Sequence, residues 1–221
     1  MIKFDRVTKR YGESRDALRE VSFSIEKDEL VFLTGHSGAG KSTLLRLIML
    51  MERSTRGQVE VNGRDLQSMG RGAIPGHRRS IGVVFQNHQL LFDRSVFDNV
   101  ALPLIIGGYD HREVGRRVRA ALDKVGLLSR EGSMPVTLSG GEQQRVGIAR
   151  AVVGKPDILL ADEPTGNLDP ALSAEIMQLF EEFNRVGVTV LIASHDLALI
   201  SRLRHRIITL RDGTMVTGTS D

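Results

Sequence analysis

A glycine-rich stretch near the start of the chain restricts the possible folds more strongly than any other feature. Residues 35–43 read GHSGAGKST, and residues 35–42 fit the pattern G-x-x-x-x-G-K-[ST]. The nearly continuous apolar run ELVFLT (29–34) precedes this stretch, as expected of a buried strand, and a segment with helical spacing follows it. A strand, a glycine turn and a helix in this order predict a loop whose backbone N–H groups surround phosphate oxygens.

The side chains of this phosphate loop suit a nucleotide. Lys41 can reach the β- and γ-phosphates, and the Ser42 hydroxyl can bind Mg²⁺. Average residue frequencies produce the pattern by chance in roughly one chain in a hundred of this length, so a purely structural interpretation is weak. The predicted phosphate-binding residues are Gly35, His36, Ser37, Gly38, Ala39, Gly40, Lys41 and Ser42.

Short apolar runs and helical segments alternate in the last third of the chain. DILLAD (157–162) and VTVLIAS (188–194) are typical of buried strands, and residues 170–187 and 196–203 have helical spacing. This alternation predicts an α/β fold with a parallel sheet and crossover helices.

Two other regions depart from that alternation. Apolar and polar side chains alternate, as in half-buried antiparallel strands, in residues 2–7, 21–26 and 58–63. Between about residues 87 and 155 the spacing is helical, and Pro103 is expected to bend or end the first helix there. We therefore expect one domain over residues 1–221, with a helical subdomain inserted at about 87–155.

A carboxylate pair follows one of the predicted buried strands, at the sheet edge where α/β folds bind ligands. ILLADEP (158–164) places Asp162 where it can hold Mg²⁺ and Glu163 where it can deprotonate an attacking water. Such a pair is by itself more often a helix cap or a solvated turn. Its combination with the phosphate loop favours the catalytic interpretation.

His195 and Gln86 follow two further strands of this kind. His195 comes directly after VTVLIAS and can donate a hydrogen bond to a γ-phosphate, although a histidine there can also cap the next helix. Gln86 ends the run SIGVVFQ (80–86) and can contact Mg²⁺ or the attacking water. An isolated glutamine in a loop carries little information, so its role depends on the other motifs.

A second glycine turn begins another predicted helix, within LSGGEQQRVGIAR (138–150). Ser139, Gly140 and Gly141 form this SGG turn, which offers backbone N–H groups and a helix dipole to an anion. A nucleotide on Lys41 does not need the turn within the same subunit. Two copies arranged head to tail would each close it over the ATP of the other, and a glycine-rich helix start without a ligand is the alternative.

Composition excludes some functions. The 221 residues include no cysteine, so disulfides and thiolate metal sites are excluded. No apolar run approaches the roughly 18 residues of a membrane span, so a membrane role requires a partner. The net charge is +3, and the densest basic stretches, 70–79 and 201–206, suit a solvated face better than nucleic acid or lipid headgroups.

The motifs occur in the order that is typical of one protein family. The phosphate loop, Gln86, LSGGEQQR, ILLADEP, GNLD (166–169) and SHD (194–196) together resemble an ABC-type ATPase over essentially the whole chain. The resemblance implies an α/β fold with a RecA-like P-loop core, an antiparallel β subdomain and an inserted α-helical subdomain. It also implies ATP and Mg²⁺ as ligands and an ATP-bound homodimer.

The resemblance further implies a role for each motif residue. Tyr11 would stack on the adenine ring, although exposed tyrosines often only cover a sheet edge. Asp169 would link the two active sites across the dimer. The phosphates and Mg²⁺ would be bound by Gly38, Gly40, Lys41, Ser42 and Thr43, and the metal site would be completed by Gln86 and Asp162. Glu163 would be the catalytic base and His195 would contact the γ-phosphate, with Lys41 and Gln86 also in the catalytic set.

Longer stretches, including residues 84–106 and 143–153, are similar to family members that act in bacterial cell division. This implies an integral membrane partner of the FtsX type, which would supply the membrane spans. It also implies peripheral association with the cytoplasmic face of the inner membrane at the division site, signalling to cell-wall hydrolases, and no nucleic acid ligand. LIMLMERSTRG (47–57) departs from the family, because it lacks Gly or Pro where relatives usually carry them.

Other functions would use the same catalytic residues. The ATPase of a lipoprotein-releasing or macrolide-type exporter differs only in its membrane partner, and a division scaffold switched by ATP would not need hydrolysis. Partner binding is expected in the apolar stretch after Gln86. The candidates for a groove that takes a partner's short helix are Phe92, Val96, Phe97 and Leu102, with the core of the helical subdomain as the alternative.

Overall fold

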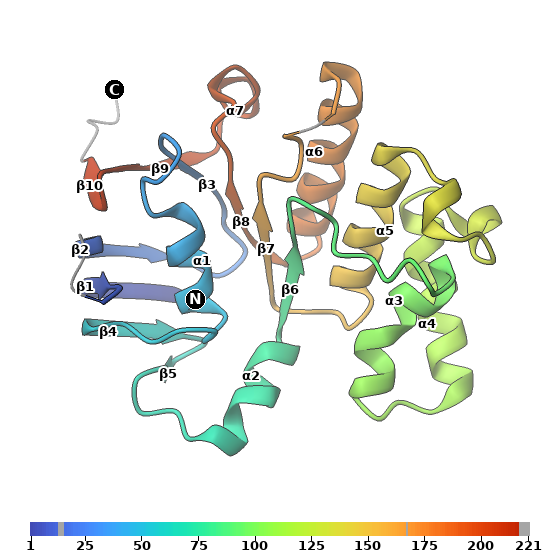
Figure 1. Ribbon diagram of the computed structural model, residues 1–221, viewed down its shortest axis with the longest axis horizontal. Helices are drawn as coiled ribbons and strands as arrows, with labels where there is room; N and C mark the ends of the chain where they lie inside the picture. Colours follow the sequence, from blue (N-terminus) through green and yellow to red (C-terminus); the bar gives the residue numbers. More distant parts are fainter. Residues whose placement is uncertain (13–15, 167, 217–221) are drawn as a thin grey trace.

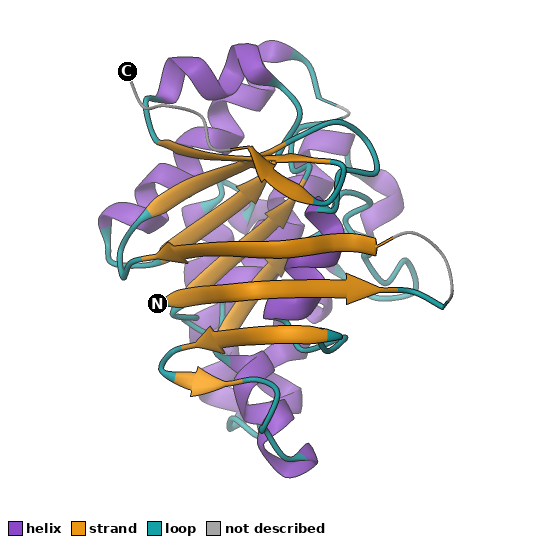
Figure 2. Ribbon diagram, turned by 90° about the vertical axis from the view of Figure 1, so that its left-hand side faces the viewer, coloured by secondary structure: helices purple, strands orange, loops and turns teal. Residues whose placement is uncertain are grey.

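The computed structural model describes residues 1–12, 16–166 and 168–216, which form two β-sheets with helices packed around them (Figure 1). The smaller sheet is antiparallel and has the strand order β2-β1-β4-β5. Its strands are β1 (Ile2–Arg10), β2 (Asp16–Ile25), β4 (Arg56–Val61) and β5 (Arg64–Asp65). Figure 2 shows them across the front of the molecule, with the second sheet behind.

The second sheet has the strand order β10-β9-β3-β8-β7-β6 and is parallel except for its edge strand β10. Strands that are far apart in sequence are neighbours here, since β3 lies between β8 and β9. The strands are β3 (Leu30–Thr34), β6 (Ile81–Val84), β7 (Ile158–Asp162), β8 (Thr189–Ala193), β9 (Arg206–Arg211) and β10 (Thr214–Val216).

Seven α-helices occur in the described part of the chain. They are α1 (Lys41–Ile48), α2 (Ile74–Arg79), α3 (Val96–Ile106), α4 (His111–Lys124), α5 (Gly140–Val152), α6 (Pro170–Arg185) and α7 (Leu197–Leu203). Among the residues described, no helix combines the length and the apolar character that a membrane crossing needs.

The central strands are apolar on both faces because each face packs against a separate core. In β3 all five residues are buried, with Phe32 in one hydrophobic cluster and Val31 and Leu33 in the other. The first cluster joins the parallel sheet to α3, α4, α5 and α6, and the second joins it to the antiparallel sheet and α1. Strands buried in this way read as continuous apolar runs, which explains the pattern of residues 29–34.

Some expectations about local structure need correction. Pro103 lies inside α3, which continues to Ile106, so the proline does not end the helix. Strands β9 and β10 were not predicted, although the turn between them contains Asp212 and Gly213, a common hairpin pair. The basic stretch 70–79 contains α2, whose Arg78 donates to the backbone oxygens of Met49 and Leu50 at the end of α1.

The departure at residues 47–57 has a structural counterpart. Leu50 adopts a left-handed conformation with φ of 51°, which favours glycine and costs a branched residue about 1–2 kcal/mol. Leu50 is also buried in the second core cluster, so its side chain offsets part of that cost. Arg53 then ties the following loop down by donating to the backbone oxygens of Leu66, Gln67 and Met69.

Candidate active site

The phosphate loop and the ends of the parallel strands form one pocket of about 460 Å³. It lies at the carboxyl ends of β3, β7 and β8, the edge at which doubly wound sheets bind ligands. The residues that line it are Ala17, His36, Ser37, Gly38, Ala39, Gly40, Lys41, Ser42, Thr43, Gln86, Asp162, Glu163 and His195. All of these except Ala17 were predicted from the sequence; Ala17 is a small residue of β2 that belongs to no recognisable motif.

The start of α1 is built to face an anion. Gly40 is its N-cap, with φ of 109° and no side-chain capping bond, so the first N–H groups of the helix point toward the loop without a capping partner. A side chain at Gly40 would lie 2.7 Å from the backbone oxygen of Ala17, which leaves room only for glycine. The local chain therefore places Lys41, Ser42 and Thr43 at the entrance of the helix.

Lys41 is 8% exposed, and its ammonium is held inside the pocket. Nζ donates to the backbone oxygen of Gly35 at 2.6 Å and lies 3.5 Å from Oε1 of Glu163. A buried cation with one loose carboxylate neighbour attracts further negative charge, which suits the phosphates of a nucleotide.

Glu163 sits between two other functional side chains. Its Oε1 faces Lys41, while its Oε2 lies 2.8 Å from Nδ1 of His195 and accepts the His195 backbone N–H at 3.3 Å. The backbone of Glu163 is left-handed, with φ of 48°, and strain of this kind persists where the surrounding structure fixes a functional residue. The alternative role of His195 as a helix cap is wrong, because Asp196 caps α7 through Leu199 N–H.

Asp162 ends β7, and its charged carboxyl is destabilised by burial in the site. Burial raises the pKa of its carboxyl above the ordinary value, the nearby Glu163 charge adds to this, and a hydrogen bond from Ser42 opposes it. A carboxylate in such surroundings gains from a bound cation.

The donor set of this pocket fits Mg²⁺. Asp162, Ser42 and Gln86 line the same space and offer carboxylate, hydroxyl and amide oxygens, the ligand types that Mg²⁺ prefers. Gln86 lies two residues beyond the end of β6, in the connecting loop and not in the strand as predicted. The described residues contain no group of three or more His, Cys, Asp or Glu able to hold a metal, so phosphate oxygens would have to complete this site.

Several predicted site residues do not line this pocket. Gly35 lies just behind it and supplies the oxygen that Lys41 binds. Tyr11 follows the end of β1, is 37% exposed, and lies beneath the Lys9 ammonium at 4.9 Å. Asp169 caps α6 by accepting from Leu172 N–H. Within GNLD, residue 167 lies outside the described part of the chain.

The SGG turn also lies apart from the pocket. It begins α5, and Figure 1 shows α1 and α5 on opposite sides of β7 and β8. Ser139 caps the helix and forms a reciprocal capping box with Glu142, whose carboxyl pKa is lowered by the hydrogen bonds from Ser139.

The two glycines of the SGG turn differ in the space around them. A Cβ at Gly141 would lie 2.2 Å from Cδ2 of Leu172 in α6, so a larger residue there would require the Leu172 side chain to shift. Gly140 has open space around it. Gly140 is therefore the glycine of this turn that packing within one subunit does not explain.

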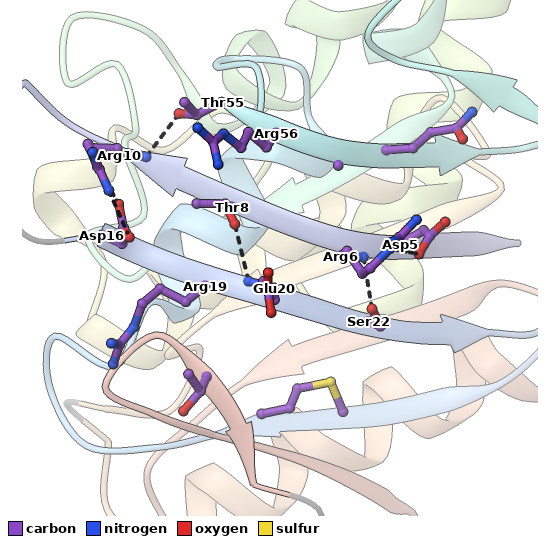
Figure 3. Close-up of a pocket in the computed structure, with 14 residues that line it drawn as sticks. Asp5, Arg6, Thr8, Arg10, Asp16, Arg19, Glu20, Ser22, Thr55 and Arg56 are labelled. Carbon is purple, nitrogen blue, oxygen red and sulfur yellow. Dashed lines mark hydrogen bonds and ion pairs between the residues drawn. The ribbon is translucent and has the colours of Figure 1, made fainter.

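A larger cavity, of about 1140 Å³, lies on the solvent side of the antiparallel sheet (Figure 3). Arg10 and Asp16 form a close pair there, with Nε and Oδ1 2.6 Å apart, and Figure 3 shows Arg56 and Arg19 on either side of that pair. This face contains no residue of the phosphate loop or of the strand ends. Size alone therefore does not identify the catalytic pocket, and we assign the chemistry to the smaller one.

Comparison with known proteins places the chain in a family. Residues 18–166 match the family model described as "ABC transporter". The cell division ATP-binding protein FtsE of Escherichia coli K12 is 58% identical over 218 residues, which cover 99% of this chain and 98% of that protein. FtsE of Mycobacterium tuberculosis is 46% identical over 217 residues, covering 98% of this chain and 94% of that protein.

Solved structures agree with the sequence relatives. The dimeric structure of MJ0796, described as a bacterial ABC transporter cassette, has a TM-score of 0.89 and 38% identity, and covers 97% of this chain and 96% of that one. A post-hydrolysis dimer of the same cassette, bound to ADP and Pi, has a TM-score of 0.88 and 37% identity over the same shares of the two chains. The predicted fold class is thus confirmed, and the chain belongs to the ABC transporter family as one of its ATPases.

Proposed function

We propose that this chain is the ATP-binding and hydrolysing subunit of a membrane complex in bacterial cell division. The observation that carries the proposal is the position of Glu163 between Lys41 and His195 in the pocket of the phosphate loop. The cell-division role is supported by the E. coli relative, which is named for that process. The proposed location is the cytoplasmic face of the inner membrane at the division site, through the partner alone.

The chemistry follows from the charges that the pocket holds. Lys41 and the N–H groups at the start of α1 bind the β- and γ-phosphates. Ser42, Gln86 and Asp162 would hold Mg²⁺, which would supply positive charge against the phosphates. Glu163 orients and deprotonates the attacking water, and His195 donates to the γ-phosphate. Since His195 contacts Glu163 directly, it also orients the base.

We propose that ATP is shared between two copies arranged head to tail. The SGG turn is a helix start of the kind that can bind an anion, it does not line the pocket of its own subunit, and Gly140 has open space in front of it. In the paired form each turn would close over the nucleotide on the partner's Lys41. The adenine would stack on Tyr11, and Asp169 would link the two sites.

Ser139→Arg tests this sharing, because a long cation at the turn would block its approach to a second subunit. We expect binding of ATP by the single chain to persist and ATP-dependent pairing to be lost, as measured by light scattering in the Glu163→Gln background. Ser129→Arg, at another exposed serine of the helical region, is the matched control. Normal pairing by Ser139→Arg would refute the shared site.

The membrane partner needs a docking surface, and a groove of about 520 Å³ offers one. It runs between α2, the end of α3 and the end of α5. Its apolar lining includes Met51, Phe85, Leu102, Ile106 and Tyr109, and Arg79 and Arg150 border it. We propose that a short cytoplasmic helix of an FtsX-like protein binds here, so that closure of the dimer acts on the membrane protein and, through it, on cell-wall hydrolases.

The groove corrects the earlier choice of lining residues. Val96 is fully buried in the first core cluster, and Phe97 packs against that cluster beneath the Arg119 guanidinium. Phe92 is 56% exposed but does not line the groove, so Leu102 is the one predicted residue that does.

Affinity capture tests the proposed function. Tagged Glu163→Gln protein in Mg-ATP, added to detergent-solubilised membranes, should retain an FtsX-like protein together with division factors, identified by mass spectrometry. The control is Lys41→Ala in the same background, which removes the phosphate contact. Recovery of an exporter permease instead would indicate that this chain is the ATPase of a lipoprotein-releasing or macrolide-type exporter. Normal division of cells that carry Glu163→Gln alone would favour an ATP-switched scaffold.

A further inference from the structure

The loop that carries Gln86 is bound firmly to the helix that begins at the SGG turn. Figure 1 shows the segment after β6 crossing α5 before it enters α3. Arg150 of α5 donates through Nη1 to the backbone oxygen of Gln89 at 2.7 Å and through Nη2 to that of His88 at 2.5 Å. The His88 imidazole Nδ1 contacts Oε1 of Gln144, which lies on the same helix.

These contacts come from one face of α5. Gln144, Gly147 and Arg150 are spaced by three residues, so they lie above one another on the helix surface. Gly147 lies between the two polar residues, and a Cβ there would lie 4.0 Å from the backbone oxygen of His88, an ordinary contact distance. The loop therefore lies close over this face of the helix.

Of the two polar residues of this face, Gln144 is buried and Arg150 is half-buried. Gln144 is 1% exposed, and within the described residues its Nε2 has no hydrogen-bond partner, so the side chain is retained with one donor unsatisfied. Arg150 has no ion-pair partner among the described residues, and burial lowers its pKa. Its charge is thus satisfied by the two loop carbonyls.

The loop itself is held in an unfavourable conformation. His88 and Gln89 are consecutive non-glycine residues with positive φ, 51° and 48°. Such a pair persists only where surrounding contacts impose it. Further along, the buried Asn99 of α3 binds both backbone groups of Leu91. The part of the loop between the end of β6 and these contacts is therefore only three residues long, Phe85, Gln86 and Asn87.

We propose that Gln144 and Arg150 are positioning residues that fix the loop at His88 and Gln89, so that Gln86 in one active site moves together with the SGG turn that serves the other. The two sites then change in step, because one rigid helix carries a contact of each. Arg150 and Phe85 also line the groove, so a helix bound there would bear on the same connection. This last step rests on the proposed function.

Hydrogen exchange of the single chain tests the connection without reference to pairing. Gln144→Leu and Arg150→Met should speed amide exchange in residues 87–91 and leave residues 36–43 unchanged. Arg150→Lys should not restore slow exchange fully, because an ammonium lacks the rigid planar fork with which the guanidinium binds the two carbonyls. Arg117→Met, which removes a guanidinium bound to Glu113 in α4, is the control. Unchanged exchange in residues 87–91 would overturn the proposal.

Kinetics then separate positioning from a structural role. Gln144→Leu should retain wild-type affinity for ATP and lower kcat by roughly 10- to 100-fold, the usual loss when the support of a metal ligand is removed. The double variant His88→Leu/Gln144→Leu should be no slower than Gln144→Leu alone, since both partners of one contact are gone. Additive losses of kcat in the double variant would overturn the proposed positioning role of Gln144. Absence of ATP-dependent pairing in protein that carries Glu163→Gln alone would instead refute the shared site, and the hydrogen-exchange result would still stand.

Discussion

Two polar cavities of this chain use charge in opposite ways. On the antiparallel sheet, Arg10 and Asp16 form a tight pair, 2.6 Å apart, with the arginine side chain 55% exposed. In the nucleotide pocket, Lys41 and Glu163 are 3.5 Å apart, and their side chains are only 9% and 11% exposed. The tighter ion pair therefore lies on the face without catalytic residues, and the looser pair lies at the site of chemistry.

The difference teaches how to recognise a reactive site. Exposed pairs satisfy each other and are screened by water, so they have little capacity left for a ligand. Buried groups that are only partly paired retain that capacity. The carboxyl pKa of Asp162 is raised by burial, whereas that of Asp16 is lowered by its hydrogen bond from Arg10.

Replacing the base gives the largest expected contrast. Glu163→Gln keeps the shape of the side chain but removes its basicity, so ATP turnover should fall by roughly 10²- to 10⁴-fold, the contribution of a general base. Binding of Mg-ATP should persist, as measured by equilibrium dialysis. The same change on the sheet face, Glu20→Gln, should leave turnover as it is. Comparable losses in the two variants would break the distinction between the cavities.

Asp162→Asn should show an opposite effect on activity and stability. Loss of a metal ligand should lower turnover by about 10- to 100-fold or more. Removal of an unfavourable buried charge should raise the melting temperature by roughly 2–4 °C, the response of a chain this size to about 1 kcal/mol. Scanning calorimetry without nucleotide measures this, with Asp123→Asn, at an exposed helix position, as the control.

The stability gain of Asp162→Asn should depend on pH, and the sign of that dependence follows from the raised pKa of Asp162. The folded protein binds a proton at Asp162 more readily than the unfolded chain, whose ordinary pKa is 3.8. The carboxylate thus weakens folding at neutral pH, and this weakening disappears as the pH falls from the raised folded value toward 3.8. The gain in Asp162→Asn should therefore shrink with acidification. A constant gain would mean that the charge is not its cause.

Asp16→Asn should have the smallest effect. Its folded pKa is lowered, so the pair with Arg10 stabilises the protein above 3.8 and is lost as the pH falls through the lower folded value. We expect a slight decrease in melting temperature at neutral pH, none in strong acid, and unchanged ATP turnover. A marked loss of turnover would assign this face a part in catalysis.

Sequence patterns predicted the positions that chemistry or periodicity marks. The phosphate loop, Asp162, Glu163 and His195 were found because each follows a recognisable apolar strand. Ala17 and the pair Gln144 and Arg150 were not found, because small or polar residues at ordinary helical or strand positions gain significance only from what the fold brings beside them. The left-handed Leu50 could not be read from its side chain either.

The hairpin between β9 and β10 has a consequence for the order of synthesis. Its Gly213 donates to the backbone oxygen of Ala39 in the phosphate loop, and its oxygen accepts from Arg19 of β2. A growing chain on the ribosome can pair β1, β2 and β4 early, but this backbone contact to the phosphate loop can form only after residue 213 has been made. A chain released before β9 would leave β3 with an open edge, an aggregation hazard that makes truncated copies substrates for proteolysis.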